Sequence, residues 1–210
     1  MFERLKKVFV RRETQPLEAA RSDAVSEWAS THGFSYSSQS KGAGVVLTGK
    51  VRGKSWKLES GAASRDYIVG EELRARAVLD INEDAAVLIM NRPLKESLEK
   101  RAYAIYTDTL QTTADPSLPE EMRWLAMYDE VGWSSLVPEF WERYTVRADR
   151  RENALAWLDS NLAELLLQWP APGLDVQTPF ILMLLRGKAY LRMQYRPPSI
   201  ATLPHAAIVY

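Results

Sequence analysis

Apolar residues recur along the chain with two different spacings. Where they occupy every second position, the spacing predicts a strand. In residues 73–79, small or apolar side chains occupy every second position with Arg74 and Arg76 between them, which is typical of a strand with one buried face. Residues 85–90 are apolar throughout, which indicates a strand buried on both faces. Further strands are predicted at residues 34–38, 44–52, 55–60, 143–147, 180–185 and 189–195.

Helices are predicted where apolar residues recur every three or four positions. The first begins near Thr14 and ends at Gly33, which can adopt the left-handed C-cap conformation, so the neighbouring His32 is expected to have a structural role. The helix at residues 150–169 has a long apolar face, with Asp149 as its N-cap. Two more helices are expected, at residues 94–106 and from Pro119 onward, and residues 200–210 form a short tail.

The tripeptide Arg-Gly-Lys stands at two predicted hairpin turns, residues 52–54 and 186–188, and a helix with a tryptophan precedes each hairpin. This similarity indicates either a duplication or the chance reuse of a good turn sequence, and the sequence leaves both open. We predict the α+β class, with two helix-plus-antiparallel-sheet halves joined by an acidic helical connector. The expected segments are a basic amphipathic start (1–13), the first half (14–113), the connector (114–141) and the second half (142–210).

Residues 1–12 combine five cations and one carboxylate with an apolar stripe at helical spacing. The stripe consists of Phe2, Leu5, Val8 and Phe9, and the cations are Arg4, Lys6, Lys7, Arg11 and Arg12. The favoured interpretation is a helix that packs on its own domain, because so short a helix binds lipid weakly. The alternative is an interfacial helix that makes weak contact with an anionic membrane surface or with an acidic partner.

Composition removes several classes of function. The 210 residues carry 27 basic and 27 acidic side chains, which argues against a nucleic-acid binder. The absence of cysteine excludes disulfides and thiol catalysis, and two histidines cannot form a three-histidine metal site. No apolar run approaches the ~20 residues that span a bilayer, and residues 1–12 lack the apolar core of a signal peptide. We expect a cytoplasmic protein with no transmembrane segment, metal or cofactor.

Arginines gather along the first predicted sheet and are the best candidates for a ligand surface. The candidates are Arg65, Arg74, Arg76 and Arg92, with Glu72 as an acid–base partner. An open face could hold a carboxylate or phosphate through paired guanidinium hydrogen bonds. The favoured alternative is internal pairing, either with acids such as Glu59 or with the connector region, since residues 115–142 hold seven carboxylates against Arg123 alone.

No catalytic motif stands out, because the chain has neither a Gly-x-Ser-x-Gly elbow nor a Walker-type phosphate loop. Trp133 follows Gly132 in a predicted loop beside Glu130, and it is the tryptophan most expected to be partly exposed. An exposed tryptophan in an acidic segment suits a protein partner with a basic rim. Trp133 and Glu130 are therefore the candidate partner-binding residues.

Several short motifs resemble uncharacterised bacterial proteins of the DUF3137 type. Residues 140–149 read Phe-Trp-Glu-Arg-Tyr-Thr-Val-Arg-Ala-Asp, and a helix and two strands ending at residues 190–193 follow, similar to that family's strand, helix and short hairpin. Residues 49–54, followed by Glu59, are similar to the family's Gly-x-x-Gly hairpin. The resemblance covers about a third of the chain, departs in lacking the family's transmembrane helices, and implies no activity or catalytic residue.

The sequence predicts a non-enzymatic protein-interaction module that binds a partner or forms a homo-oligomer, with peripheral membrane contact as an option. The alternative is an enzyme or small-anion-binding protein that uses the arginine-rich sheet face.

Overall fold

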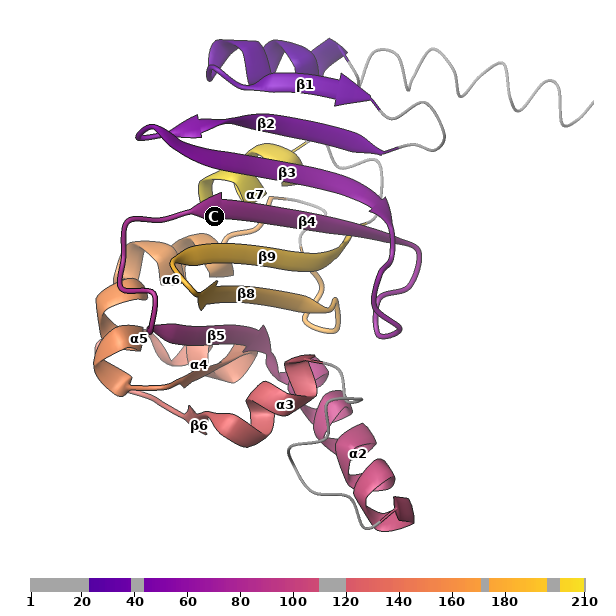
Figure 1. Ribbon diagram of the computed structural model, residues 1–210, viewed down its shortest axis with the longest axis vertical. Coiled ribbons are helices and arrows are strands. Elements are labelled where there is room, and N and C mark those ends of the chain that lie inside the picture. Colours follow the sequence, from indigo (N-terminus) through magenta and orange to yellow (C-terminus); the bar gives the residue numbers. More distant parts are fainter. Residues whose placement is uncertain (1–22, 39–43, 110–119, 171–173, 196–200, 210) are drawn as a thin grey trace, which may run out of the picture.

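The computed structural model describes residues 23–38, 44–109, 120–170, 174–195 and 201–209. The basic segment 1–13 and the predicted helix start at Thr14 lie outside the described residues. The described chain forms one sheet of nine antiparallel strands in the order β1-β2-β3-β4-β9-β8-β5-β7-β6 (Figure 1). The strands are β1 (Ser35–Ser38), β2 (Val45–Val51), β3 (Lys54–Ala62), β4 (Glu71–Val78), β5 (Ala86–Asn91), β6 (Asp129–Glu130), β7 (Tyr144–Ala148), β8 (Phe180–Leu185) and β9 (Lys188–Tyr195).

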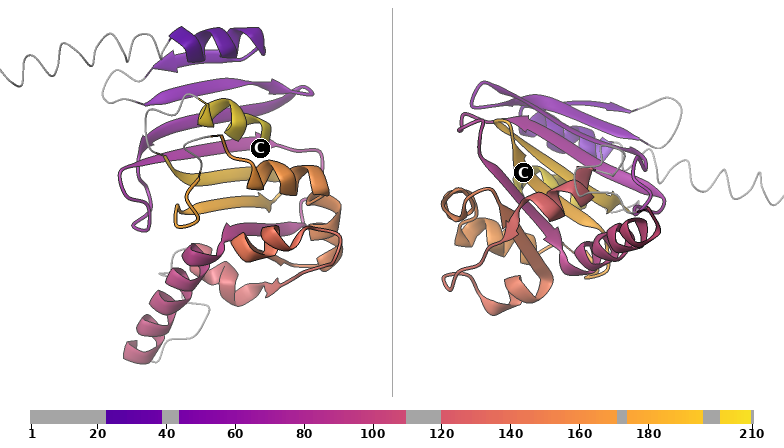
Figure 2. Two further views of the ribbon diagram at one scale, coloured as in Figure 1. Left: turned by 180° about the vertical axis from the view of Figure 1, so that it is seen from behind. Right: turned by 60° about the horizontal axis from the view of Figure 1, so that its bottom comes forward.

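Helices pack on both faces of this sheet, which confirms the α+β class. One face carries the helix at residues 23–31 with α4 (Pro138–Arg143), α5 (Arg151–Trp157), α6 (Ser160–Leu167) and α7 (Thr202–Val209). The other face carries α2 (Arg92–Thr109) and α3 (Glu120–Met127), which pack on β5 and β8. Seen from behind, α6 and α7 lie before the sheet and α2 projects from its lower end (Figure 2).

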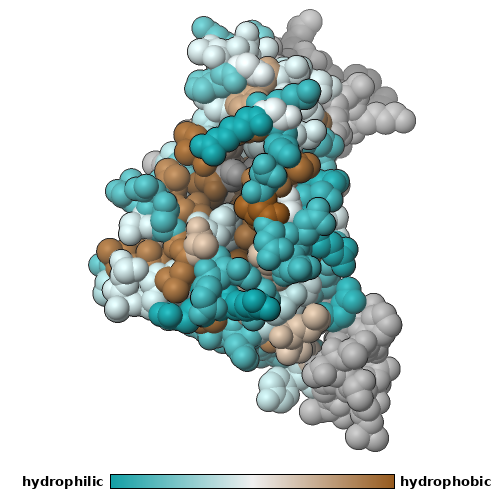
Figure 3. All heavy atoms as spheres, turned by 60° about the vertical axis from the view of Figure 1, so that its left-hand side comes forward, coloured by the Kyte–Doolittle hydropathy of each residue, from teal (hydrophilic) through white to brown (hydrophobic). Residues whose placement is uncertain are grey.

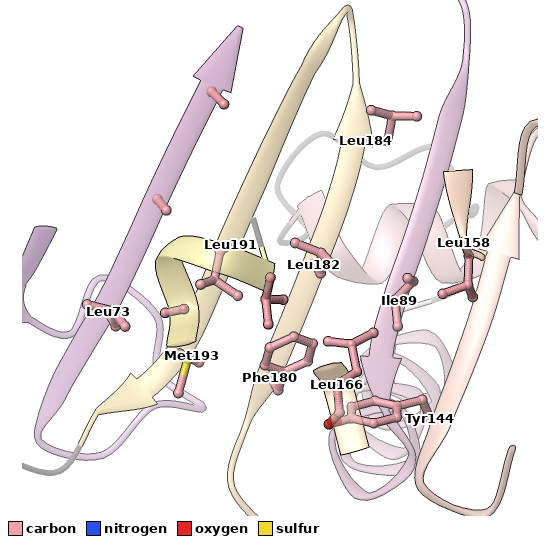
Figure 4. Close-up of a cluster of buried hydrophobic side chains, with 14 of the residues drawn as sticks. Leu73, Ile89, Tyr144, Leu158, Leu166, Phe180, Leu182, Leu184, Leu191 and Met193 are labelled. Atoms are coloured by element: carbon pink, nitrogen blue, oxygen red, sulfur yellow. The ribbon is translucent and has the colours of Figure 1, made fainter. Parts of the chain in front are cut away.

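The main core lies between the sheet and the first group of helices. Inward-facing side chains of neighbouring strands meet there, and Figure 4 shows Leu191, Leu182, Phe180 and Ile89 in this layer. Tyr144 of β7 is buried beside them, and its hydroxyl donates a hydrogen bond of 2.7 Å to the carbonyl oxygen of Leu166 in α6. Burial raises the pKa of Tyr144 to about 12. This bond fixes α6 over β7.

Both predicted hairpins form, with their turns at the Arg-Gly pairs. Arg52 and Gly53 have φ values of 49° and 78°, and Arg186 and Gly187 have 51° and 67°. Two successive residues with positive φ make the type I′ turn, whose twist matches that of the flanking strands. The lysine of each tripeptide is the first residue of the next strand. The shared turn geometry leaves the choice between duplication and coincidence open.

The two-half architecture is not confirmed, because strands from both expected halves form one continuous sheet. The β8–β9 hairpin lies between β4 and β5, so Arg74 of β4 is opposite Arg192 of β9 and Ile89 of β5 is opposite Leu182 of β8. The main core also draws on both expected halves. The expected boundary between residues 141 and 142 falls inside α4.

The region after β7 differs from the prediction in three ways. The single helix expected at residues 150–169 is two helices, because the chain bends at Leu158, which is buried, and Asp159 caps α6 by accepting a 2.8 Å hydrogen bond from the Leu162 amide. Asp149 is not a helix cap, since its carboxylate accepts from the Ala86 amide of β5 and from the Asn153 side chain. The expected tail contains α7, which buries three apolar residues in the core.

Candidate functional site: a basic sheet face beside a buried ion-pair cluster

Cationic side chains gather on the sheet face that α2 and α3 leave uncovered. On β4, Leu73 and Ala75 point into the main core, so Arg74 and Arg76 point to the opposite face. The strand register places Arg76 between Lys57 of β3 and Tyr190 of β9. The same parity puts further cations on this face, and no helix lies in front of β2, β3 and β4 in Figure 1.

We call this surface the basic face, defined by Lys50, Lys57, Glu59, Arg74, Arg76, Lys188 and Tyr190. It holds five cations and one carboxylate. Glu59 pairs with Lys57 and lies 3.4 Å, Oε1 to Nε, from Arg74, so two cations share the single carboxylate. Arg76 is exposed and makes no ion pair within the described part of the chain. The face is therefore basic, and among the described residues the guanidinium of Arg76 has no acidic partner.

A buried ion-pair cluster borders the basic face where α3 meets the sheet. Glu121 of α3 is 2% exposed, and its Oε1 accepts hydrogen bonds from Arg65 Nε at 2.8 Å and from the Tyr67 hydroxyl at 3.0 Å. The Oε1 atom of Glu72, which is fully buried, accepts from Arg192 at 2.6 Å. Arg192 Nε also lies 3.9 Å from the same Glu121 oxygen.

The cluster contains two arginines and two glutamates, so its net charge is zero and its ion pairs hold neighbouring elements of the fold together. Burial alone would lower the pKa of Arg65, but the hydrogen bond and charge of Glu121 outweigh it and raise that pKa. Burial and the adjacent Glu121 carboxylate raise the pKa of Tyr67 above its ordinary value, so its hydroxyl stays protonated as a donor. The cluster joins α3 to β4, β9 and the loop before β4.

A second set of ion pairs holds the connector against the sheet on the same face. Arg92 donates a hydrogen bond from Nε to the Trp141 carbonyl, and its Nη2 atom lies 3.3 Å from Glu130 Oε1. Glu130 also lies 3.5 Å from Lys95 Nζ. Burial opposes ionisation of Glu130, but hydrogen bonding with Thr145 and the charges of Lys95, Arg92 and Arg147 outweigh it and hold the pKa of Glu130 below its usual value. Arg147 of β7 donates to two carbonyls at the end of α3.

The structure thus places the candidate ligand residues in three different settings. Arg65 and Glu72 belong to the buried cluster, and Arg92 pairs with connector residue Glu130. Arg74 is partly paired on the basic face, and Arg76 alone among the five is open. Internal pairing therefore accounts for most of the arginine group, and the pairing acids include residues of the connector.

The candidate partner-binding residues lie together near the end of β6, but neither is free. Trp133 is half-buried and packs edge-to-face on Trp141, with ring centroids 5.2 Å apart. Glu130 forms ion pairs with Arg92 and Lys95.

His32, which is predicted to have a structural role, shares a 2.8 Å hydrogen bond between its Nδ1 atom and the Trp28 carbonyl oxygen.

Residues of β9 and α3 complete this face, and they are not among the candidates that the sequence predicts. Arg192 and Tyr190 alternate with apolar residues in β9, which signals an outward position, but their neighbours depend on the pairing of β9 with β4. Glu121 lies in the first turn of α3, where a carboxylate ordinarily interacts with the helix dipole. Only its burial shows that it binds Arg65 instead of water.

Comparison with known proteins adds little to this description. No protein-family model matches the chain, and no curated protein matches it. The chain is similar to the crystal structure of the mycobacterial trehalose monomycolate transport factor A, TtfA, at 12% identity and a TM-score of 0.49, covering 90% of this chain and 89% of that one. The resemblance to the DUF3137 type stays a prediction.

Two features are absent from the residues that the structure describes. None of the helices there is long and apolar enough to cross a membrane. No group of three or more His, Asp or Glu side chains in those same ranges is placed to hold a metal ion.

Proposed function

We propose that the protein is a non-enzymatic interaction module that binds an acidic polypeptide segment through the basic face. The observation that carries this proposal is the basic face on β2, β3, β4 and β9, whose defining residues include five cations and one carboxylate, and where Arg76 makes no ion pair with any residue that the structure describes. Charge of one sign on a binding surface attracts a partner of the opposite sign and speeds the encounter. Arg76 can form two parallel hydrogen bonds with one carboxylate.

The shape of the site favours a polypeptide over a membrane. α2 and α3 pack on the same face of the sheet, on β5 and β8, and a packed helix rises about 10 Å above the surface it covers. A flat bilayer that touched these helices would stay away from Arg76 by more than the ~8 Å over which charges act at physiological salt. An extended peptide is narrow enough to lie beside α3 and reach the strands. Peripheral membrane contact and a cytoplasmic location stay predictions.

The test uses a fluorescent peptide of ten glutamates as the probe, with binding followed by anisotropy at low and at physiological salt. Arg76→Glu combined with Lys50→Glu removes two cations of the basic face. Arg150→Glu combined with Lys100→Glu makes the same change of net charge at exposed positions elsewhere. We expect the first variant to bind at least tenfold more weakly, or ~1.4 kcal/mol, and the control to bind like the native chain.

Four outcomes would overturn the proposal. These are absence of peptide binding by the native chain, equal loss in both variants, binding only to phosphatidylglycerol vesicles, and full competition by millimolar inorganic phosphate that depends on Arg76. The third outcome would indicate a membrane surface, and the fourth would indicate the small-anion-binding alternative.

A further inference from the structure

An open groove with an apolar floor runs along α6, on the sheet face opposite to the basic face. It has a volume of about 650 Å³ and lies between α6 and residues 135–139, which lead into α4. Leu136, Val137, Ala163 and Leu167 supply the apolar part of its lining. Figure 3 shows the side of the molecule on which α5 and α6 lie, and hydrophobic residues are visible there among polar ones.

The groove has an acidic rim. Glu139 and Glu164 stand on its two walls and are both exposed, and its lining includes neither lysine nor arginine. Val137 keeps 51% of its surface exposed, so part of the apolar lining is in contact with water. An apolar surface with a charged rim is typical of a site that binds an amphipathic helix of opposite charge.

We propose that this groove binds residues 1–12 of a second copy of the chain. That segment lies outside the described residues, but its sequence has the required chemistry: four apolar residues at helical spacing and five cations against one carboxylate. The apolar stripe packs on the accessible apolar lining, which Val137 and Leu167 provide, and the cations face Glu139 and Glu164. This proposal is independent of the basic face, and it assigns a role to the basic amphipathic segment, which the proposed function does not use.

The lengths of the segment and the groove agree. As a helix, the stripe from Phe2 to Phe9 rises about 10.5 Å, at 1.5 Å per residue. The groove wall on α6 runs from Ser160 to Gln168, which corresponds to about 12 Å at the same rise.

The span of the sheet favours a second copy over the same chain. The helix at residues 23–31 lies beside β1 in Figure 1, and Tyr144 of β7 donates a hydrogen bond to the Leu166 carbonyl of α6. Seven strand spacings separate β1 from β7, or about 34 Å at ~4.8 Å each. The ten residues 13–22 reach about 33–36 Å only when fully extended. A second copy meets no such limit.

The test measures self-association of the full chain by sedimentation equilibrium. Glu139→Lys with Glu164→Lys reverses the groove rim, and Lys6→Glu with Lys7→Glu reverses two charges of the segment. Each pair is expected to raise the dimer dissociation constant at least about tenfold by placing like charges together. The four changes combined restore opposite charges and are expected to recover the native value to within about threefold. Glu27→Lys with Glu96→Lys, both exposed and outside the groove, is the matched control.

Three results would overturn the proposal. The first is a native chain that stays monomeric at all concentrations. The second is a dimer that all three pairs of substitutions affect equally or that the charge exchange does not restore. The third is a segment whose only effect is to bind phosphatidylglycerol vesicles, which would place residues 1–12 on a membrane instead.

Discussion

Glu121 joins α3 to the sheet, and its replacement by glutamine tests whether the buried ion pairs hold that helix. Glu121→Gln keeps the size of the side chain and removes the charge that faces Arg65 and Arg192. Removing one partner of a buried ion pair costs about 3–5 kcal/mol, because the other charge stays buried without compensation. The side chains of Arg65 and Arg192 are 30% and 17% exposed, so water reaches them in part and the loss should lie near the lower limit, about 3 kcal/mol.

Urea unfolding followed by tryptophan fluorescence measures this loss as a change in the free energy of unfolding. At about 2–4 °C per kcal/mol for a chain of this size, Tm should fall by about 6–12 °C. Glu59→Gln is the control, because Glu59 pairs with Lys57 and Arg74 at the surface and should cost less than about 1 kcal/mol.

Equal losses for the two glutamine variants would refute this reasoning about the cluster. A double-mutant cycle with Arg65→Gln separates the pair from other effects of the substitutions. We expect a coupling energy of at least about 1 kcal/mol between Glu121 and Arg65, and independent losses would show that the 2.8 Å contact contributes nothing to stability.

Two further predictions concern a turn and a pH dependence. Gly187→Ala should cost about 1–2 kcal/mol in urea unfolding, because φ is 67° there and a Cβ would lie 3.3 Å from Glu83, whereas Gly132→Ala, with open space around it, should be neutral; equal effects would contradict the turn argument. The lowered pKa of Glu130 means that its charge stabilises the fold above the ordinary pKa of about 4.3 and that this contribution disappears as the pH falls through the lowered value. The difference in free energy of unfolding between the native chain and Glu130→Gln should therefore be constant near pH 6 and shrink below about pH 4. A difference that grew as the pH fell would contradict the prediction.

For the basic face, the sequence pattern predicts which way the arginines point but not which residues they pair with. The period of two placed Arg74 and Arg76 on one face of β4, and the structure has them there. The pattern could not tell which of the two is paired, because Glu59 reaches Arg74 through the register of β3 with β4. Arg65 was grouped with them by proximity in sequence, yet its partner Glu121 lies 56 positions away.

The sequence by itself determined the local elements: the two Arg-Gly-Lys turns, the fully apolar strand β5, and the helix that follows Pro119. Each depends on residues that are neighbours in the chain, where φ preferences and side-chain period act directly. Tertiary structure alone decided that the β8–β9 hairpin enters the sheet between β4 and β5. That placement, which pairs Arg192 with Glu72 and makes one sheet of the two expected halves, follows from long-range backbone pairing and core packing that no local pattern specifies.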